Sequence, residues 1–469
     1  MATQESVTIP GVNIAVKKWR VYVGDQSPSQ IPAAKDTRIV ASPDPRPSER
    51  SQFLARFLDS FCPDGYELLA PSERSAHFWV RELFTVHGQS PLLDVAFSTL
   101  ATTYVSQSSR NTQLQRQAAM LYDRSIRELG LTMRRNVAAA DIRILASIMC
   151  LAFAEVFSPL QDREHGWIAH NKGACEILMS RGHALLKTEL GRSMFLRFRI
   201  SGLYAAIGRR EAFPLAGQEF SWLSRLANSN YFDYLVEEMM SIPQLLKDMK
   251  DLATETVQTV VYSMVQKISI RANAIMGAIL HWLADFRLKH HPHPCVWFEP
   301  LHDIDESSGR PLYLEQLRFP NLLVAQAMIH YWATLIILLK CVLFCAPIVG
   351  NVAAASPLLG SESGGYLGFP PANNANACRE EPTGSGLNIR LLQLADAIAC
   401  SVRYCTSEKA GATGPLALLF PLWVAKDTYE SGNDAACQQK TEYCLGVFRK
   451  LMERGVKFSE PLRKHTPPQ

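Results

Sequence analysis

The sequence predicts an all-α fold, a multi-helix antiparallel array that forms one large helical domain. From about Ser51 onward, apolar residues recur three and four positions apart, as one face of a helix requires. Alternation of apolar and polar residues, which would indicate strands, forms no convincing series. The 469 residues are 47% hydrophobic and 20% charged, which suits a globular protein with a large core. A helical array fits this pattern, and alternating strand–helix units do not.

Residues 1–50 are expected to form a disordered or extended N-terminal tail. They have little apolar periodicity and are rich in proline, at Pro28, Pro32, Pro43, Pro45 and Pro47. One basic and aromatic cluster interrupts the tail and could contact phosphates and bases, namely Lys17, Lys18, Trp19 and Arg20. A solvated tail with one anchoring tryptophan is the simpler interpretation of this cluster.

The helical domain is expected to span residues 51–460, followed by a C-terminal tail at residues 461–469. Periodicity predicts helices over residues 51–61, 74–87, 91–105, 112–129, 142–157, 167–182, 192–210, 231–250, 257–287 and 321–343, with a helical section over 388–454. Asn111 is a plausible N-cap, and Gly130 and Gly182 are expected to end two helices. Residues 346–388, rich in Gly, Pro, Ser and Asn, predict a long irregular insertion.

Tyr331–Phe344 is the most apolar run of the chain. A membrane span needs about 20 predominantly apolar residues. Lys340 interrupts this run, and Gln326 and His330 precede it. The sequence therefore favours a buried central helix over a membrane span.

Charge and cysteine content narrow the class of protein. A net charge of +4 is small for a domain that grips DNA over its whole surface. The eleven cysteines are scattered, and no signal peptide opens the chain. Reduced thiols in a cytosolic or nuclear protein are the simpler interpretation.

Two groups of residues could carry metal or thiol chemistry. Three histidines and a cysteine lie close together, His290, His291, His293 and Cys295, with His302 and Asp303 behind them. Imidazole and thiolate bind zinc or copper, but the intervening prolines hold the segment extended, so a polar loop is favoured. The pairs Cys341/Cys345 and Cys400/Cys405 are expected to be buried apolar thiols. We expect no metal and no cofactor in this chain.

Signatures of common enzyme classes are missing from the sequence. It contains no Gly-x-Gly-x-x-Gly after a strand, no phosphate-binding loop and no Gly-x-Ser-x-Gly elbow. His165 and His170 do not have the spacing of a zinc protease. Paired carboxylates such as Glu237 and Glu238 are not brought into one cleft by any pattern. An enzyme is therefore unsupported.

Four segments, taken in order, carry a family resemblance. The segment from Gly166 to Gly182 has an aromatic residue, a histidine, a small pair and an Arg-Gly ending, at Trp167, His170, Gly173, Ala174, Arg181 and Gly182. Tyr122–Leu129 carries Tyr-x-x-Ser-x-x-x-Leu, and Phe198–Leu215 ends with Arg209, Arg210, Phe213 and Pro214. Leu419–Ala425 contains Phe420, Pro421 and Trp423. Together these segments resemble the middle homology region of fungal-specific transcription factors.

This resemblance implies a regulator of transcription in a fungal nucleus, acting through a helical domain. It also implies a small-molecule effector or protein partner, homodimerisation or pairing with a complete family member, and control of a metabolic or secondary-metabolite gene cluster. His170 would be a structural histidine bonded within the helical core. Lys17 to Arg20 would follow the family's zinc cluster.

The chain departs from the family pattern at the zinc cluster. In the family, six cysteines bind two zinc ions and form the module that places a recognition helix in the DNA groove. Before Cys150 this chain has only Cys62. Either the gene model is truncated at its start, or this is a free-standing regulatory domain that contacts DNA only indirectly.

Two other functions stay open. A helical protein of the same fold could serve as an enzyme or accessory protein in small-molecule biosynthesis, with a cavity lined by Trp282, Trp297, Tyr331 and Trp332. The simpler interpretation makes these four aromatics ordinary core residues. A module that sequesters another regulator is the third alternative.

Overall fold

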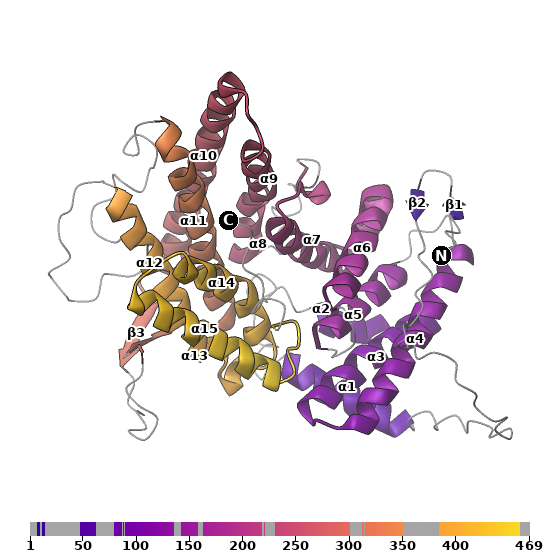
Figure 1. The fold of residues 1–469 in the computed structure, drawn as a ribbon. Coiled ribbons are helices and arrows are strands. Elements are labelled where there is room, and N and C mark those ends of the chain that lie inside the picture. Colours follow the sequence, from indigo (N-terminus) through magenta and orange to yellow (C-terminus); the bar gives the residue numbers. More distant parts are fainter. Residues whose placement is uncertain are drawn as a thin grey trace, which may run out of the picture.

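A computed structural model describes residues 7–9, 12–14, 47–61, 79–86, 88, 90–135, 142–157, 163–217, 220, 230–300, 312–313, 315–349, 367 and 384–459. Within these residues the protein is predominantly helical, which confirms the predicted all-α class. The N-terminal helices lie on one side and the C-terminal helices on the other, with α7 and α8 between them (Figure 1).

The N-terminal group contains two helices, the third and the fifth, that are buried over most of their length. Its members are α1 (Pro47–Phe61), α2 (Trp79–Val86), α3 (Pro91–Ser108), α4 (Thr112–Arg135), α5 (Ile142–Phe157), α6 (Arg163–Leu185) and α7 (Glu189–Arg209). Helix α3 packs on both α4 and α5, and α5 packs on α6. Asn111 caps α4 as predicted, because its side-chain oxygen accepts hydrogen bonds from the backbone amides of Gln113 and Leu114 at 3.0 and 3.1 Å.

The middle group holds the longest helices. It consists of α8 (Tyr231–Met239), α9 (Ile242–Leu252), α10 (Gln258–His290) and α11 (Leu322–Val349). The prediction of one helix over residues 231–250 is wrong, because the chain turns at Met240 and Ser241. Pro243 lies in the first turn of α9, where its missing N–H costs no helical hydrogen bond.

Helix α11 runs through the core. It is long and apolar enough to cross a membrane by length and composition, but 72% of its most apolar window is buried by the rest of the protein. It packs against α8, α10, α12 and α14. Helix α11 is therefore buried on several sides, as expected for a central helix.

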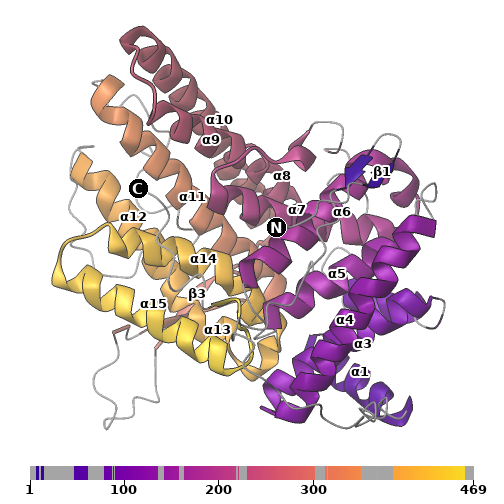
Figure 2. The same ribbon diagram turned by 45° about the vertical axis from the view of Figure 1, so that its right-hand side comes forward.

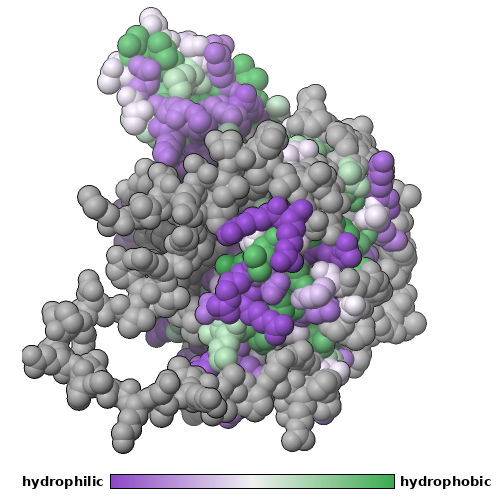
Figure 3. All heavy atoms as spheres, turned by 90° about the vertical axis from the view of Figure 1, so that its right-hand side faces the viewer, coloured by the Kyte–Doolittle hydropathy of each residue, from purple (hydrophilic) through white to green (hydrophobic). Residues whose placement is uncertain are grey.

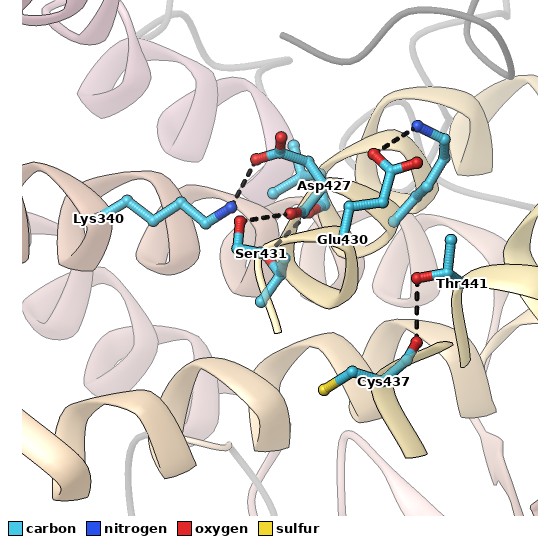
Figure 4. A network of polar contacts seen from close by, with 9 residues as sticks. Lys340, Asp427, Glu430, Ser431, Cys437 and Thr441 are labelled. Carbon is cyan, nitrogen blue, oxygen red and sulfur yellow. Dashed lines mark hydrogen bonds and ion pairs between the residues drawn. The ribbon is translucent and has the colours of Figure 1, made fainter. Parts of the chain in front are cut away.

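The C-terminal group is α12 (Gly384–Cys400), α13 (Val402–Cys405), α14 (Thr413–Glu430) and α15 (Ala435–Glu453). Helix α14 packs between α11, α12 and α15. The Lys340 ammonium of α11 bonds the Asp427 carboxylate of α14 and joins the two helices (Figure 4). Lys426 bonds Glu430 at 2.8 Å within α14.

Two short antiparallel strand pairs, which the sequence analysis did not predict, accompany the helices. They are β1 (Val7–Ile9) with β2 (Val12–Ile14), and β3 (Trp297–Pro300) with β4 (Glu315–Arg318). In the second pair Trp297 lies opposite Arg318 and Pro300 opposite Glu315. Strands of three or four residues are too short to produce a clear alternation in the sequence.

Both predicted glycine stops are wrong. Helix α4 continues past Gly130 to Arg135, and α6 continues past Gly182 to Leu185. A glycine within a helix costs only about 1 kcal/mol relative to alanine, which tertiary packing outweighs. Leu185, beyond Gly182, is buried in the core.

The irregular segments are shorter than predicted. Helix α1 begins at Pro47 within the predicted tail, while α11 ends at Val349 and α12 begins at Gly384 within the predicted insertion. Leu367, from the middle of that insertion, is buried and accepts a hydrogen bond from the Trp332 indole at 2.9 Å. The other residues of 350–383 and the tail at 461–469 lie outside the described residues.

Buried apolar side chains from all three groups form one continuous cluster. Backbone bonds also join distant parts: the Ala412 amide donates to the Ser60 carbonyl at 2.8 Å, and the Phe458 amide donates to the Val156 carbonyl at 3.1 Å. Figure 2 shows α13 and α15 close to the N-terminal helices in a second view. Helices α1 and α5 are therefore packed against the C-terminal part of the described chain.

The face that carries α4 shows no broad apolar area among its coloured residues (Figure 3). Met120 and Leu131 of α4 are exposed singly, at 54% and 43%. Scattered apolar residues of this kind are normal on a protein surface.

Candidate functional site

The histidine of the central motif is bonded to the tyrosine of another motif. The Tyr122 hydroxyl lies 2.9 Å from His170 Nε2 and donates to the Glu155 carboxylate. Glu155 is only 6% exposed, and burial raises its pKa. Burial also lowers the pKa of His170 to about 4, so this imidazole is neutral at pH 7 and its Nε2–H can donate to the hydroxyl. His170 therefore belongs to a polar network linking α4, α5 and α6.

The glycine of the central motif that makes room for other groups is Gly166 and not Gly173. A Cβ on Gly173 would meet nothing within 4 Å, whereas a Cβ on Gly166 would lie 2.6 Å from the Glu155 carboxylate. Ala174 is fully buried, and Trp167 packs against the Phe458 ring with centroids 5.0 Å apart. Gly166 is therefore the position where a small residue makes room for the polar network.

The remaining residues of the first and third motifs occupy separate places. Arg181 lies in α6, and its side chain is outside what the structure describes. Arg209 ends α7 and bonds Glu211 on the surface at 2.9 Å, and Arg210 follows as a left-handed cap with φ 52°. Pro214 begins a short 3-10 turn. None of these residues joins the network around His170 within the described contacts.

The third and fourth motifs meet where α7 faces α11 and α14. The Tyr204 ring is stacked on Phe420 with centroids 4.4 Å apart and 7° between the planes. The Tyr204 ring is also stacked on His330 of α11, at 5.5 Å and 22°. Trp423 packs beside Phe420, and Pro421 is buried between them in sequence. We call Tyr204, His330 and Phe420 the ring stack.

Two arginines of α7, Arg197 and Arg199, have different surroundings. Arg199 is 1% exposed and fully bonded: its guanidinium contacts the Glu237 carboxylate at 2.7 Å and the Leu215 carbonyl at 3.1 Å. Arg197 lies over the Phe153 ring at 4.8 Å, and its buried Nε has no hydrogen-bond partner. Within the described residues, no carboxylate is paired with Arg197.

The charge of Arg197 affects the pKa of His330 in the ring stack. Burial lowers the pKa of Arg197 to about 10, which still leaves it charged at pH 7. Burial, opposed by a bond to the Gln326 carbonyl and assisted by the Arg197 charge, lowers the pKa of His330 to about 3. Because the Gln326 carbonyl lies 2.7 Å from His330 Nδ1 and can only accept, the proton of the neutral ring is on Nδ1.

Further polar atoms without partners lie within a helical turn of the ring stack. They are the Tyr204 hydroxyl, Gln326 Oε1, Thr334 Oγ1 and Trp423 Nε1. Gln326 and Thr334 flank His330 at a spacing of four, so the three share one face of α11. Most buried polar groups in proteins are bonded, and a cluster of exceptions needs an explanation. With Arg197 and the ring stack, these four residues define the junction site.

A surface pocket of about 550 Å³ lies elsewhere, where the β3–β4 pair meets the end of α13 and the end of α15. Arg318, Arg403 and Arg454 line it, but Arg318 is paired with Glu299 at 2.5 Å and Arg454 donates to the Thr406 carbonyl at 2.8 Å. Most of its charge is thus already bonded within the protein.

The other predicted sites find no support as sites. Lys17, Lys18, Trp19 and Arg20 lie outside the described residues, as do His302 and Asp303. His290 bonds the Phe286 carbonyl at 2.8 Å, and no group of three metal-ligating side chains occurs among the described residues. Glu237 is engaged by Arg199.

The cysteine pairs behave as apolar side chains. Cys341, Cys345 and Cys405 are buried and Cys400 is half-buried, all as free thiols. Burial raises the pKa of Cys341, Cys400 and Cys405 to about 12. A thiol with so high a pKa carries little thiolate at pH 7 and is a poor nucleophile.

Three of the four aromatics suggested for a cavity are core residues. Tyr331 and Trp332 are fully buried, and the indole of buried Trp282 donates to the Tyr231 carbonyl at 3.0 Å. Trp297 is instead 41% exposed. The sequence did not indicate Arg197 and Tyr204, each of which has a buried polar atom without a hydrogen-bond partner. No sequence motif marks a side chain that lacks a partner.

Comparison of the chain with protein-family models, with curated proteins and with solved structures finds no match.

Proposed function

We propose that this protein regulates transcription in the manner of the fungal-specific transcription factors that its motifs resemble. One observation carries the proposal: two of the residues that carry the resemblance, Tyr122 and His170, are bonded to each other across 48 residues. The segments that hold the third and fourth motifs also meet, because Tyr204, which is not itself a motif residue, is stacked on Phe420.

In this role the helical body receives a signal and passes it to a partner. The protein acts in the nucleus, and it reaches DNA through a partner that carries the zinc cluster or through a module absent from this chain. The partner is a second copy or a complete family member. Its targets are the genes of a metabolic cluster.

Deletion of the gene in its source organism tests this function. Reduced or raised transcripts across a set of neighbouring genes, together with nuclear localisation of the tagged protein, support a regulator. Unchanged transcripts with one accumulated intermediate would contradict it. Light scattering of the purified protein at micromolar concentration, alone and with candidate partners, tests the association.

Complementation supplies a matched control. Phe344→Leu changes a side chain that is 44% exposed and should restore the transcripts. Phe420→Leu keeps an apolar residue but removes the ring that contacts Tyr204, and should restore them less well. Circular dichroism of both variants verifies that they are folded.

A second function, small-molecule biosynthesis, is favoured by one observation, the unbonded polar groups of the junction site. The same deletion separates the two, because an enzyme alters a metabolite without altering transcripts.

A further inference from the structure

The surface pocket of about 550 Å³ brings together three arginines from separate elements. Arg318 belongs to β4, Arg403 to α13, and Arg454 directly follows α15. A buried apolar residue lies within two positions of each arginine and fixes the backbone there. The fold therefore holds three guanidinium groups around one concave surface, which we call the arginine pocket.

The three arginines differ in how far they are already bonded. Arg318 donates to the Glu299 carboxylate at 2.5 Å. Arg454 donates to the Thr406 carbonyl at 2.8 Å, which uses one of its five N–H groups. Arg403 is exposed and has no hydrogen bond or ion pair with any residue that the structure describes. Arg403 and Arg454 therefore keep donors that a ligand in the pocket can use.

The balance of charge in the arginine pocket favours an anion. The lining holds two carboxylates, Glu299 and Glu408, against the three guanidinium groups. Glu299 is already bonded by Arg318, so its charge is largely compensated. A phosphate group carries between one and two negative charges and three acceptor oxygens, so it can engage two guanidinium groups at once. A single carboxylate has oxygens for one such fork, so phosphate is the better match.

The pocket also has room for more than a phosphate group, and an aromatic side chain stands beside it. Its volume lies within the range of small-molecule sites, about 300–1,000 Å³. Trp297 lies opposite Arg318 in the β3–β4 register, so the two side chains share one face, with Cβ atoms about 5 Å apart. Trp297 is 41% exposed, although tryptophan is highly buried on average. An exposed indole beside arginines can stack on a flat ring.

We propose that the arginine pocket binds a nucleotide, with its phosphate groups on Arg403 and Arg454 and its base stacked on Trp297. Arg318 keeps its bond to Glu299 and adds positive charge at the side of the pocket nearest the base. The phosphates supply the ionic attraction, and stacking selects ligands that carry a ring.

Binding of ADP to the purified protein, measured by calorimetry and by tryptophan fluorescence, tests the proposal. Saturable binding is expected, and it should weaken as salt is added because the contacts are ionic and exposed. Pyrophosphate should bind at least tenfold more weakly because it lacks the base. Adenosine should show no saturable binding because it lacks the charge.

Three variants assign the parts of the ligand to their residues. Arg403→Gln should weaken ADP binding about tenfold to a hundredfold, the range for a hydrogen bond to a charged group, and should leave the melting temperature unchanged because Arg403 has no bond to lose. Trp297→Leu should weaken ADP about tenfold, as loss of stacking does, and leave pyrophosphate unaffected. Arg449→Gln is the matched control, because Arg449 is exposed on α15 outside the pocket lining, and it should bind ADP like the native protein.

Four results would overturn the proposal. They are no saturable binding of ADP or UDP, ADP binding by Arg403→Gln as tight as that of the native protein, an equal loss in Arg449→Gln, and pyrophosphate or sulfate binding as tight as ADP. The third would indicate attraction to surface charge in general, and the fourth a site for inorganic anions only. The measurements use purified protein, so their outcome is independent of any effect on transcription.

Discussion

His330 makes stability depend on pH. Its folded-state pKa of about 3 lies far below the usual value of 6.5, because the ring is buried and Arg197 is near. The unfolded chain therefore takes up a proton at this residue between pH 6.5 and 3, and the folded protein does not. The stability that neutral His330 contributes is present above pH 6.5 and is lost as the pH falls toward 3.

His330→Phe should reduce this dependence while keeping a ring in the stack. Between pH 6 and 4 the free energy of unfolding of the native protein should fall more steeply than that of the variant, by about 1.4 kcal/mol per pH unit. Urea unfolding at several pH values measures both curves. His170 and Asp233 also titrate abnormally, but they do so in both proteins and drop out of the difference. Parallel curves would contradict the prediction.

The residue scale also shows what a sequence can reveal about a site. That His170 is bonded inside the core was predictable, because it belongs to a motif on a helical face. Its bond to Tyr122 was not, since α4 and α6 meet only through tertiary packing. Arg197 carried no signal, because the lack of a partner depends on every neighbouring element at once.

The corner between α6 and α7 depends on a single glycine. Thr188 caps α7 by accepting a hydrogen bond from the Gly191 amide at 3.0 Å, and this brings Gly191 against the end of α6. A Cβ on Gly191 would lie 1.9 Å from the Leu185 carbonyl oxygen. That contact is with backbone, which has little room to move.

Gly191→Ala should lower the free energy of unfolding by about 1–3 kcal/mol, as overpacking does. Gly208 of the same helix is the matched control, because a Cβ there would meet nothing within 4 Å. Gly208→Ala should be neutral or stabilising by up to about 1 kcal/mol. Thermal and urea unfolding compare the two, and equal effects would refute the steric explanation.

At the scale of elements, periodicity predicted most helices and failed at their ends. The apolar patterns of α3, α5 and α11 each continue over several helical turns, so the sequence predicted these helices clearly. The helix ends predicted at Gly130 and Gly182 were wrong because a glycine permits a helix end without requiring one. The break before α9 was missed because Pro243 reads equally as an interruption or as the first turn of a new helix.

The whole molecule should unfold as one unit despite its 469 residues. Its buried apolar side chains form a single cluster, and backbone bonds join α1 to the segment before α14 and α5 to Phe458. We expect the thermal transitions measured by far-ultraviolet circular dichroism and by tryptophan fluorescence to coincide. Two separated transitions would mean that the N-terminal and C-terminal helices form independent units.

The bond from Thr413 to the Phe61 carbonyl spans 352 residues and has a consequence during synthesis. At about 5–20 residues per second, a ribosome needs roughly 18–70 s to add that length of chain. Throughout this time the end of α1 lacks its partner, and the emerging helices expose apolar side chains to solvent. We therefore expect chaperones to bind the nascent chain until its last helices leave the exit tunnel.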